Sequence, residues 1–157
     1  MDETVRLWVF ASENIRNIQM GFEAGKWAVT EIDEKSMKAR YTKSRWMEIG
    51  EHGLIYCSED RNFTMPFAIL SKPEFTIISG VWPEPWASPF NIKPLGSPNR
   101  TLSLDSAKQS WKYFRHEERA NPTWRLNGMN GKTVFSPNDI PEGDWKSILR
   151  DLGFPQQ

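Results

Sequence analysis

Aromatic side chains stand beside amides and cations in this sequence, and these residue types together suit a pocket for a nucleobase. The chain holds 8 Trp among 157 residues, more than one core of this size needs, so some of these rings are expected to contact a ligand. Aromatic faces stack on bases, amides match the hydrogen-bonding edge of a base, and cations contact phosphates. The sequence therefore indicates a pocket that stacks a base and contacts its edge.

Catalytic chemistry has few candidate residues. The sequence contains no Gly-rich phosphate loop, no His-Glu-x-x-His motif and no paired Cys, and only His52 and His116 supply imidazole. Cys57 and His52 could act as nucleophile and base, but the place of Cys57 on an apolar strand favours a small core residue. We therefore expect no enzyme activity, no cofactor and no metal site.

The composition predicts one compact soluble domain spanning residues 1–157. The chain has 20 Lys and Arg against 20 Asp and Glu, with 38% hydrophobic residues, and a domain of this length needs no disulfide or metal to be stable. A lone Cys57 fits a reducing, cytoplasmic setting. The acidic N-terminus is followed by only a short apolar run, which fits neither a signal peptide nor a membrane span.

Zero formal net charge argues against nucleic-acid binding by bulk electrostatics, but the charge is segregated along the chain. Residues 35–45 contain five cations and no acid, and a second basic set lies on a helix predicted from Asp105. Either set could be a solvated face, or it could contact phosphates and make binding depend on salt. The candidate phosphate-binding residues are Lys35, Lys38, Arg40, Lys43, Arg45, Lys108, Lys112 and Arg115.

Short strands and helices must position these residues. Ser12-Glu13-Asn14 can cap a helix over residues 14–24 that ends at Gly25, and the basic segment predicts a second helix or helical turn over 35–46. A third helix is expected over 105–114, and a last one over 145–152, after the loop at 121–131. Apolar runs with turn signals between them predict strands, partly as an antiparallel meander, at 5–11, 26–32, 54–58, 64–70, 74–81 and 90–95.

The Trp residues fall into different classes by position. Trp8 and Trp145 are expected in the core, whereas Trp46 and Trp111 lie among cations and could either pack or flank a groove. Residues 82–89 place two Trp and three Pro in a stiff loop that has little backbone freedom to lose on binding.

The order of several short motifs resembles the EVE and YTH domains of the PUA-like superfamily. The segments SENIRN (12–17) and GKWAVT (25–30) are similar to the opening of these domains. IGEHGLIY (49–56) looks like the start of their central strand, and IPEGDWKSI (140–148) is similar to the ending of EVE-type domains. The resemblance covers nearly the full chain. It implies a mixed α/β PUA-like fold, with a curved and mostly antiparallel sheet or barrel flanked by short helices.

The resemblance also implies an aromatic cage for a modified base. Trp27 matches the cage Trp of the second strand, and Asn17 matches an Asn that hydrogen-bonds the base edge. The opposing wall is expected from Trp82, with Trp86 as the alternative, so that two indole rings face each other across a slot for one base. Where YTH domains have a polar residue, Ala28 would contact the ligand only through its backbone. The expected base-binding residues are Trp27, Trp82, Trp86, Asn17, Ser12 and Ala28.

The function implied by this resemblance is recognition of a flipped, modified base, with N6-methyladenine expected first. The alternatives are a reader of modified cytosine in DNA, a small ASCH-like hydrolase, and a protein-interaction module that uses the Pro-Trp loop. Such domains occur alone and as specificity modules of McrB-type modification-dependent restriction enzymes. The expected partners are therefore methylated DNA or RNA and a fused or associated nuclease or NTPase, with no membrane.

Overall fold

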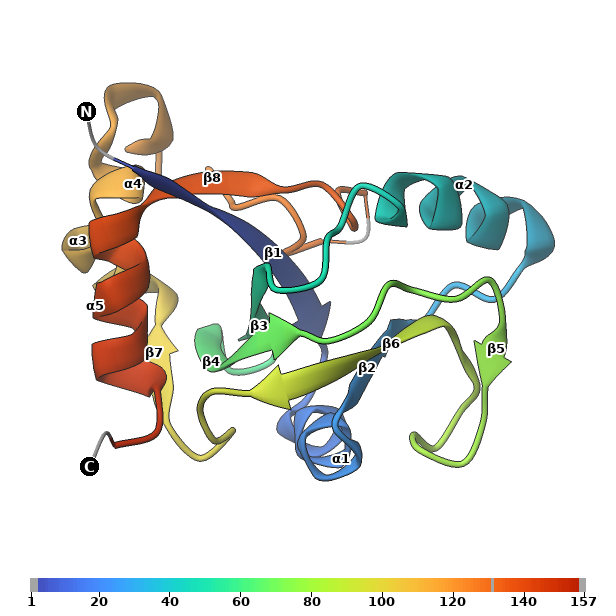
Figure 1. The fold of residues 1–157 in the computed structure, drawn as a ribbon. Coiled ribbons are helices and arrows are strands. Elements are labelled where there is room, and N and C mark those ends of the chain that lie inside the picture. The colour runs from blue at the N-terminus through green and yellow to red at the C-terminus, as the bar shows by residue number, and fades with distance from the viewer. Residues whose placement is uncertain (1–2, 131, 156–157) are drawn as a thin grey trace.

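The computed structural model describes residues 3–130 and 132–155, and one curved sheet runs through it (Figure 1). Its strands follow the order β2-β6-β4-β3-β1-β8, with β5 added to β6 and β7 added to β4. The β1–β3 pair is parallel, and the other pairs are antiparallel. This mixed architecture, with a mostly antiparallel sheet and short flanking helices, confirms the predicted fold class.

The strands are β1 (Thr4–Ser12), β2 (Lys26–Val29), β3 (His52–Cys57), β4 (Asn62–Ile69), β5 (Ile77–Ile78), β6 (Trp86–Pro94), β7 (Thr101–Ser103) and β8 (Asn138–Pro141). The helices are α1 (Ile15–Ala24), α2 (Glu34–Ser44), α3 (Leu104–Ser110), α4 (Lys112–Arg115), the 3-10 turn η1 (Glu117–Arg119) and α5 (Glu142–Leu152). Within the part of the chain that the structure describes, no helix is long and apolar enough to cross a membrane.

Parallel pairing of β1 with β3 requires a crossover, and the chain makes it through α1, β2 and α2. Helix α1 begins where the Asn14 side chain accepts a hydrogen bond from the backbone N–H of Asn17, and it ends at Gly25 in the left-handed conformation. Both ends therefore lie where the sequence predicts them, and the crossover delivers Trp27 to β2.

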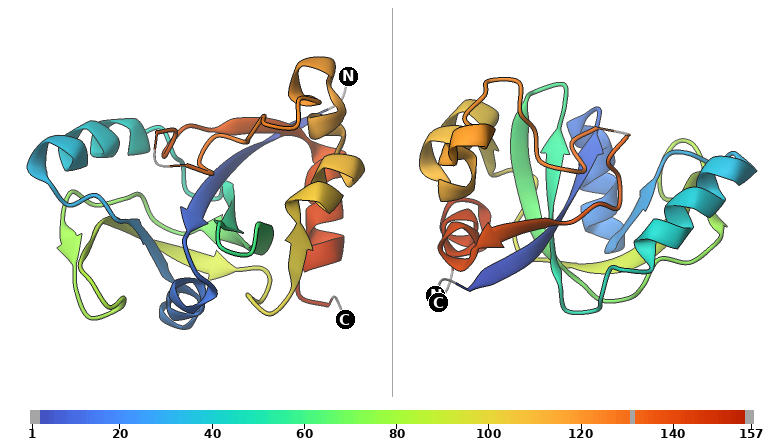
Figure 2. Two further views of the ribbon diagram at one scale, coloured as in Figure 1. Left: turned by 180° about the vertical axis from the view of Figure 1, so that it is seen from behind. Right: turned by 90° about the horizontal axis from the view of Figure 1, so that it is seen from above.

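Alternation along the strands divides the core into two clusters. On β1, Trp8 and Phe10 join one cluster together with residues of α1, α2, β2 and β6, whereas Leu7 and Val9 join a second cluster together with α3, α4 and α5. Helix α2 lies at one end of the molecule, and α3, α4 and α5 gather at the other end (Figures 1 and 2). As expected, Trp8 and Trp145 are core residues.

Several elements differ from the sequence-based expectation. The strand expected over 74–81 is only the two-residue β5, and β6 begins at Trp86 because the expected loop over 82–89 enters the sheet early. The helix expected over 105–114 breaks at Trp111, whose backbone is extended. There the Asp144 carboxylate accepts hydrogen bonds from the N–H groups of Lys112 and Tyr113, so a distant residue starts α4. Strands β7 and β8 were not predicted.

Candidate functional site

A cavity of about 140 Å³ opens where β1, β2, α2 and the start of β6 meet the loop that precedes β8. Pockets for drug-sized ligands have volumes of roughly 300–1,000 Å³, so this cavity suits one small planar group. Its lining residues are Phe10, Ala11, Trp27, Ala28, Val29, Thr30, Glu31, Arg40, Trp86, Gly128, Asn130 and Val134. The apolar part comes mainly from β1, β2 and β6. The polar part comes from the residues after β2, from Arg40 of α2 and from Asn130 of the loop that precedes β8.

Two indole rings form the aromatic wall of the cavity. The side chain of Trp27 is only 1% exposed, yet its ring borders the cavity. Its ring centroid lies 5.4 Å from that of Trp86, with an angle of 75° between the planes. Helix α1 holds Trp27 from behind, because a Cβ on Gly21 would lie 2.8 Å from the Trp27 ring. Trp86 is 5% exposed, so both rings are packed in the core and each presents only a small part of its surface to the cavity.

The third indole of the cluster, Trp82, does not line the cavity. It stacks on Trp86 with 4.0 Å between ring centroids and 10° between planes, and it meets Trp27 at 82°. The expected slot between the facing rings of Trp27 and Trp82 is therefore not open in this structure. Burial of apolar surface explains the difference, because these two indoles, four residues apart, cover each other within the core cluster.

The Trp82 ring is fixed by a hydrogen bond from its Nε1 to the backbone carbonyl of Asn17, at 3.0 Å. Replacing Trp82 by Phe keeps much of the stacking but removes this bond. We expect the free energy of unfolding to fall by about 0.5–1.5 kcal/mol, the usual net worth of one hydrogen bond, as measured by urea denaturation. An unchanged urea midpoint would show that this hydrogen bond contributes nothing measurable to the stability of the fold.

The expected base-edge residues lie beside the cavity rather than on its lining. The Asn17 backbone is engaged at both ends, its N–H by the Asn14 side chain and its carbonyl by Trp82. The buried Ser12 hydroxyl donates to the Asn14 carbonyl. Of the six expected base-binding residues, the structure brings Trp27, Ala28 and Trp86 onto the cavity and holds Trp82 and Asn17 directly behind them.

The polar groups at the cavity include Arg40, one of the expected phosphate-binding residues, together with Glu31 and Asn130, which sequence analysis did not single out. Thr30 and Glu31 follow β2, and Glu31 lies 3.6 Å from the guanidinium of Arg40. Asn130 belongs to the segment NGMNG (127–131). Its two glycines are the sequence signal that predicts a loop whose backbone can approach another segment closely.

That loop is fixed tightly against β1. Gly128 has a φ of +96°, and a Cβ there would lie 1.7 Å from the Val9 carbonyl oxygen. The buried Asn138 side chain adds a second tie, because its Nδ2 donates to the carbonyls of Leu7 and Asn127 and its Oδ1 accepts from the Asn127 N–H. Asn130 and Val134 therefore reach the cavity from a well-anchored segment.

The two basic sets do not come together. Those on α2 lie near the cavity, and those on α3 and α4 lie at the opposite end of the molecule (Figures 1 and 2). Lys108 donates to the Pro122 carbonyl at 2.7 Å, and burial, with help from Arg125 and Arg61, lowers its pKa. One strand of a few nucleotides that enters the cavity would meet the α2 set and not Lys108, Lys112 or Arg115.

A shallow groove beside the cavity concentrates part of the α2 set. It is lined by Ser36, Ala39, Arg40, Lys43, Lys132 and Val134, and it shares Arg40 and Val134 with the cavity. Lys132 is a cation that sequence analysis missed, since it stands alone in a polar loop. The remaining cations of this set, Lys35 and Lys38 on α2 and Arg45 at its end, are exposed and do not line the groove.

Cys57 and His52, the candidate nucleophile and base, do not line the cavity. Burial lowers the pKa of His52, which packs against Trp145 with 4.6 Å between ring centroids. Burial likewise raises the pKa of the Cys57 thiol, which keeps it protonated and unreactive. Among residues 3–130 and 132–155, no group of three His, Cys, Asp or Glu could hold a metal ion.

Comparison with known proteins bears on the fold of the chain. No family model matches it, and no curated protein matches it. Among solved structures, the YTH domain of the Zygosaccharomyces rouxii MRB1 protein in complex with N6-methyladenosine RNA matches with a TM-score of 0.62 and 18% identity, covering 100% of this chain and 92% of that chain. The Toxoplasma CPSF4 YTH domain in apo form gives 0.58 and 12%, covering 97% and 90%.

A bacterial structure matches as well. Protein Atu2648 from Agrobacterium tumefaciens has a TM-score of 0.52 and 15% identity, and the match covers 96% of this chain and 97% of that chain. These identities are low, so the likeness concerns architecture. The chain has the fold of YTH domains over nearly its whole length.

Proposed function

We propose that this protein binds single-stranded nucleic acid that carries N6-methyladenine and takes the modified base into the cavity between Trp27 and Trp86. The observation that carries the proposal is the cavity itself, which has two indoles on its wall and polar groups at its rim, within a YTH-type fold. The similar YTH domain of MRB1 was solved with N6-methyladenosine RNA, so methylated RNA is the first ligand to test. The role is binding, with no reaction assigned to the site.

Affinity and selectivity would come from different parts of the site. Stacking a base on an aromatic ring contributes about 1–3 kcal/mol. Burying the extra methyl group contributes about 0.8 kcal/mol, and contacts of the base edge with Thr30, Glu31 or Asn130 would add to the discrimination. Taking a base out of a duplex costs a few kcal/mol, which favours an unpaired strand.

The partner strand and the wider setting follow from the same proposal. Methylated DNA and DNA that carries modified cytosine also present a modified base. Each of them therefore forms a separate arm of the binding test. A place beside a nuclease or NTPase, as in modification-dependent restriction, stays a prediction that rests on the sequence resemblance.

The deciding experiment is a fluorescence-anisotropy titration with oligonucleotides matched in sequence, methylated and plain, as RNA and as DNA. We expect the methylated RNA strand to bind more tightly than its plain counterpart. Equal affinity for methylated and plain strands would refute a role in recognising the modification, even if both bound tightly. Tighter binding of modified cytosine DNA would transfer the function to that ligand.

Salt dependence tests the groove beside the cavity. Replacing Lys43 by Gln removes one cation of the groove, so the slope of log affinity against log salt should become shallower by about 0.7–1, the value for one phosphate contact. The loss should be equal for methylated and plain strands. Lys112→Gln, at the far end of the molecule, is the matched control and should leave the slope unchanged. A shift with Lys112→Gln equal to that of Lys43→Gln would contradict the assignment.

A further inference from the structure

A second set of aromatic side chains lies on the other flank of α2, away from the groove. Tyr41 packs against Phe75 of the loop between β4 and β5, with 5.1 Å between ring centroids and 38° between planes. Phe75 is 51% exposed, and Trp46, directly after the helix, is 72% exposed. Exposed aromatic rings next to one another are unusual on a soluble surface, since burial would remove them from water.

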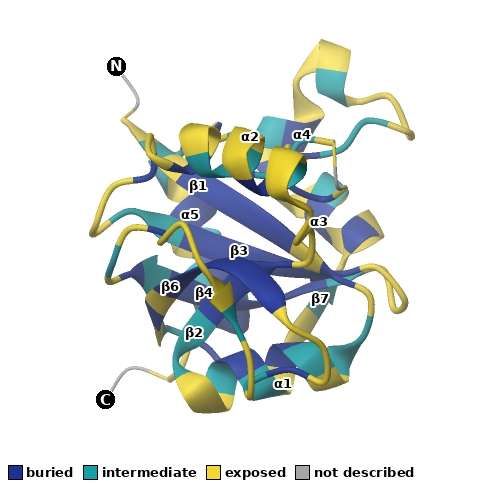
Figure 3. Cartoon of the chain, turned by 90° about the vertical axis from the view of Figure 1, so that its right-hand side faces the viewer, coloured by how far each residue is buried: buried dark blue, intermediate teal, exposed yellow. Residues whose placement is uncertain are grey.

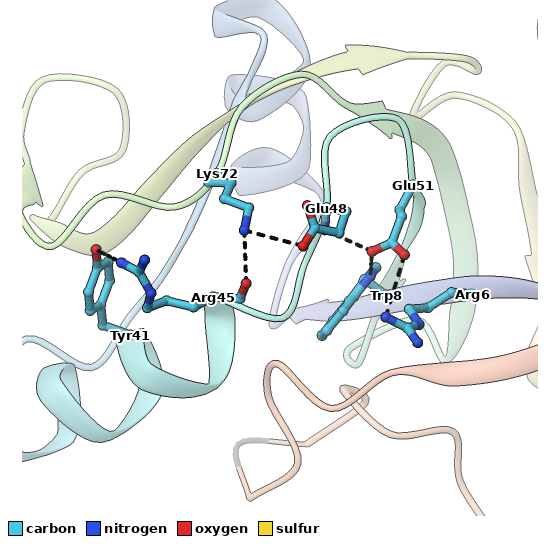
Figure 4. A network of polar contacts seen from close by, with 7 residues as sticks. All are labelled: Arg6, Trp8, Tyr41, Arg45, Glu48, Glu51 and Lys72. Atoms are coloured by element: carbon cyan, nitrogen blue, oxygen red, sulfur yellow. Dashed lines mark hydrogen bonds and ion pairs between the residues drawn. The ribbon is translucent and has the colours of Figure 1, made fainter.

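Cations accompany these rings. The Arg45 guanidinium lies 5.7 Å from the centroid of the Tyr41 ring and donates to the Tyr41 hydroxyl at 3.0 Å. Lys72 donates to the Arg45 carbonyl at 3.0 Å and is also 3.3 Å from the Glu48 carboxylate (Figure 4). These contacts hold the end of α2 against the loop that carries Phe75, so the aromatic side chains have a fixed support.

From this arrangement we propose a second nucleobase site, formed by Tyr41, Arg45 and Phe75 with Trp46 beside it, which stacks an unpaired base of the bound strand. Single-stranded nucleic acid is bound by exposed aromatic rings for the bases together with cations for the backbone, and the arrangement needs no particular sequence because every base has a flat face. Charge complementarity favours this occupant, since Arg45 and Lys38 of the same helical segment are exposed cations, whereas the charge of Lys72 is paired with Glu48.

The second site lies within reach of the same strand. Lys43 and Arg40 face the groove, whereas Tyr41 and Arg45 lie on the opposite flank of the same helix, which is about 10 Å wide. The surface between the two flanks is the exposed outer face of α2 (Figure 3), and it carries Lys35 and Lys38. The inference rests on the proposed function, because the strand is positioned by the base in the cavity.

The test compares two lengths of methylated RNA, a trinucleotide with the modified base in the middle and a strand of about nine nucleotides, a common site size. Phe75→Ala should weaken binding of the longer strand by at least about fivefold, as expected for one lost stacking contact. It should leave the trinucleotide and the ratio of methylated to plain affinity unchanged. Phe154→Ala, which removes a ring of similar exposure (46%) elsewhere on the surface, is the matched control and should change neither length.

Two results would overturn the second site. One is a Phe75→Ala effect on the longer strand no larger than that of Phe154→Ala, and the other is an equal loss for both lengths. If Phe75→Ala lowers the melting temperature, Trp46→Ala replaces it, with the same expectation. Equal binding of methylated and plain strands would refute the proposed function but not the second site. The second site would still be supported if Phe75→Ala weakened binding of the longer strand only.

Discussion

Trp27→Ala is expected to abolish measurable selectivity for a methylated strand. The variant loses a stacking face, worth about 1–3 kcal/mol, and opens the wall of the cavity that distinguishes the methyl group. Because Trp27 is buried in the core cluster of β1, β2 and β6, the same change should lower the free energy of unfolding by about 3–5 kcal/mol. Binding and stability must therefore be measured together, by anisotropy and by urea denaturation.

Trp111→Ala is the control for Trp27→Ala. Trp111 is equally buried but belongs to the other core cluster, with α3, α4 and α5. It should show a comparable loss of stability and unchanged selectivity for the methylated strand. Trp27→Phe, which fills more of the space, should separate the two effects further. Retained selectivity in a folded Trp27→Ala protein would refute the cavity as the binding site.

Gly128→Ala, in the loop that closes the cavity, is expected to be strongly destabilising. Its Cβ would lie 1.7 Å from the Val9 carbonyl oxygen, which belongs to the backbone of a central strand and cannot move aside. The left-handed backbone adds about 1–2 kcal/mol, and overpacking adds about 1–3 kcal/mol or more. We expect a loss of at least 3 kcal/mol in total, with weaker binding because Asn130 and Val134 are displaced.

Gly50→Ala separates these two contributions. Gly50 has a similar φ of +91° but nothing within 4 Å of its Cβ position. It should cost only the conformational part, about 1–2 kcal/mol, and leave binding unchanged. If both variants lost the same stability, the contact between Gly128 and Val9 would not be what fixes the loop.

Local signals along the sequence predict the first half of the fold well. The strand, capped helix and strand that end at Trp27 are set by neighbours in the chain, namely Asn14 at the start of α1 and Gly25 at its end. The break of the third helix could not be predicted in this way. It depends on the Asp144 carboxylate, more than thirty positions away, which competes for the backbone N–H groups.

The candidate site was predictable in its aromatic part and not in its polar part. Trp27 and Trp86 stand out by residue type and by the motif around them. Glu31 has no such signal beyond its place after β2, and Asn130 reaches the cavity only because a distant loop closes onto β1 through Gly128 and Asn138. Likewise, the stacking of Trp82 on Trp86 depends on the contact of this loop with α1 through the Asn17 carbonyl, which no local pattern encodes.

The parallel pairing of β1 with β3 has a consequence for how the cavity is assembled. The segment that carries Trp27 and the basic helix is the long connection between these two neighbouring strands, and non-local pairings of this kind pay the entropy of loop closure before they gain contacts. The placement of Trp27 and α2 at the cavity therefore depends on a non-local pairing as well as on neighbours in the chain. A fragment that ends before β3 would hold Trp27 and the cations of α2 but would lack the strand that closes this connection.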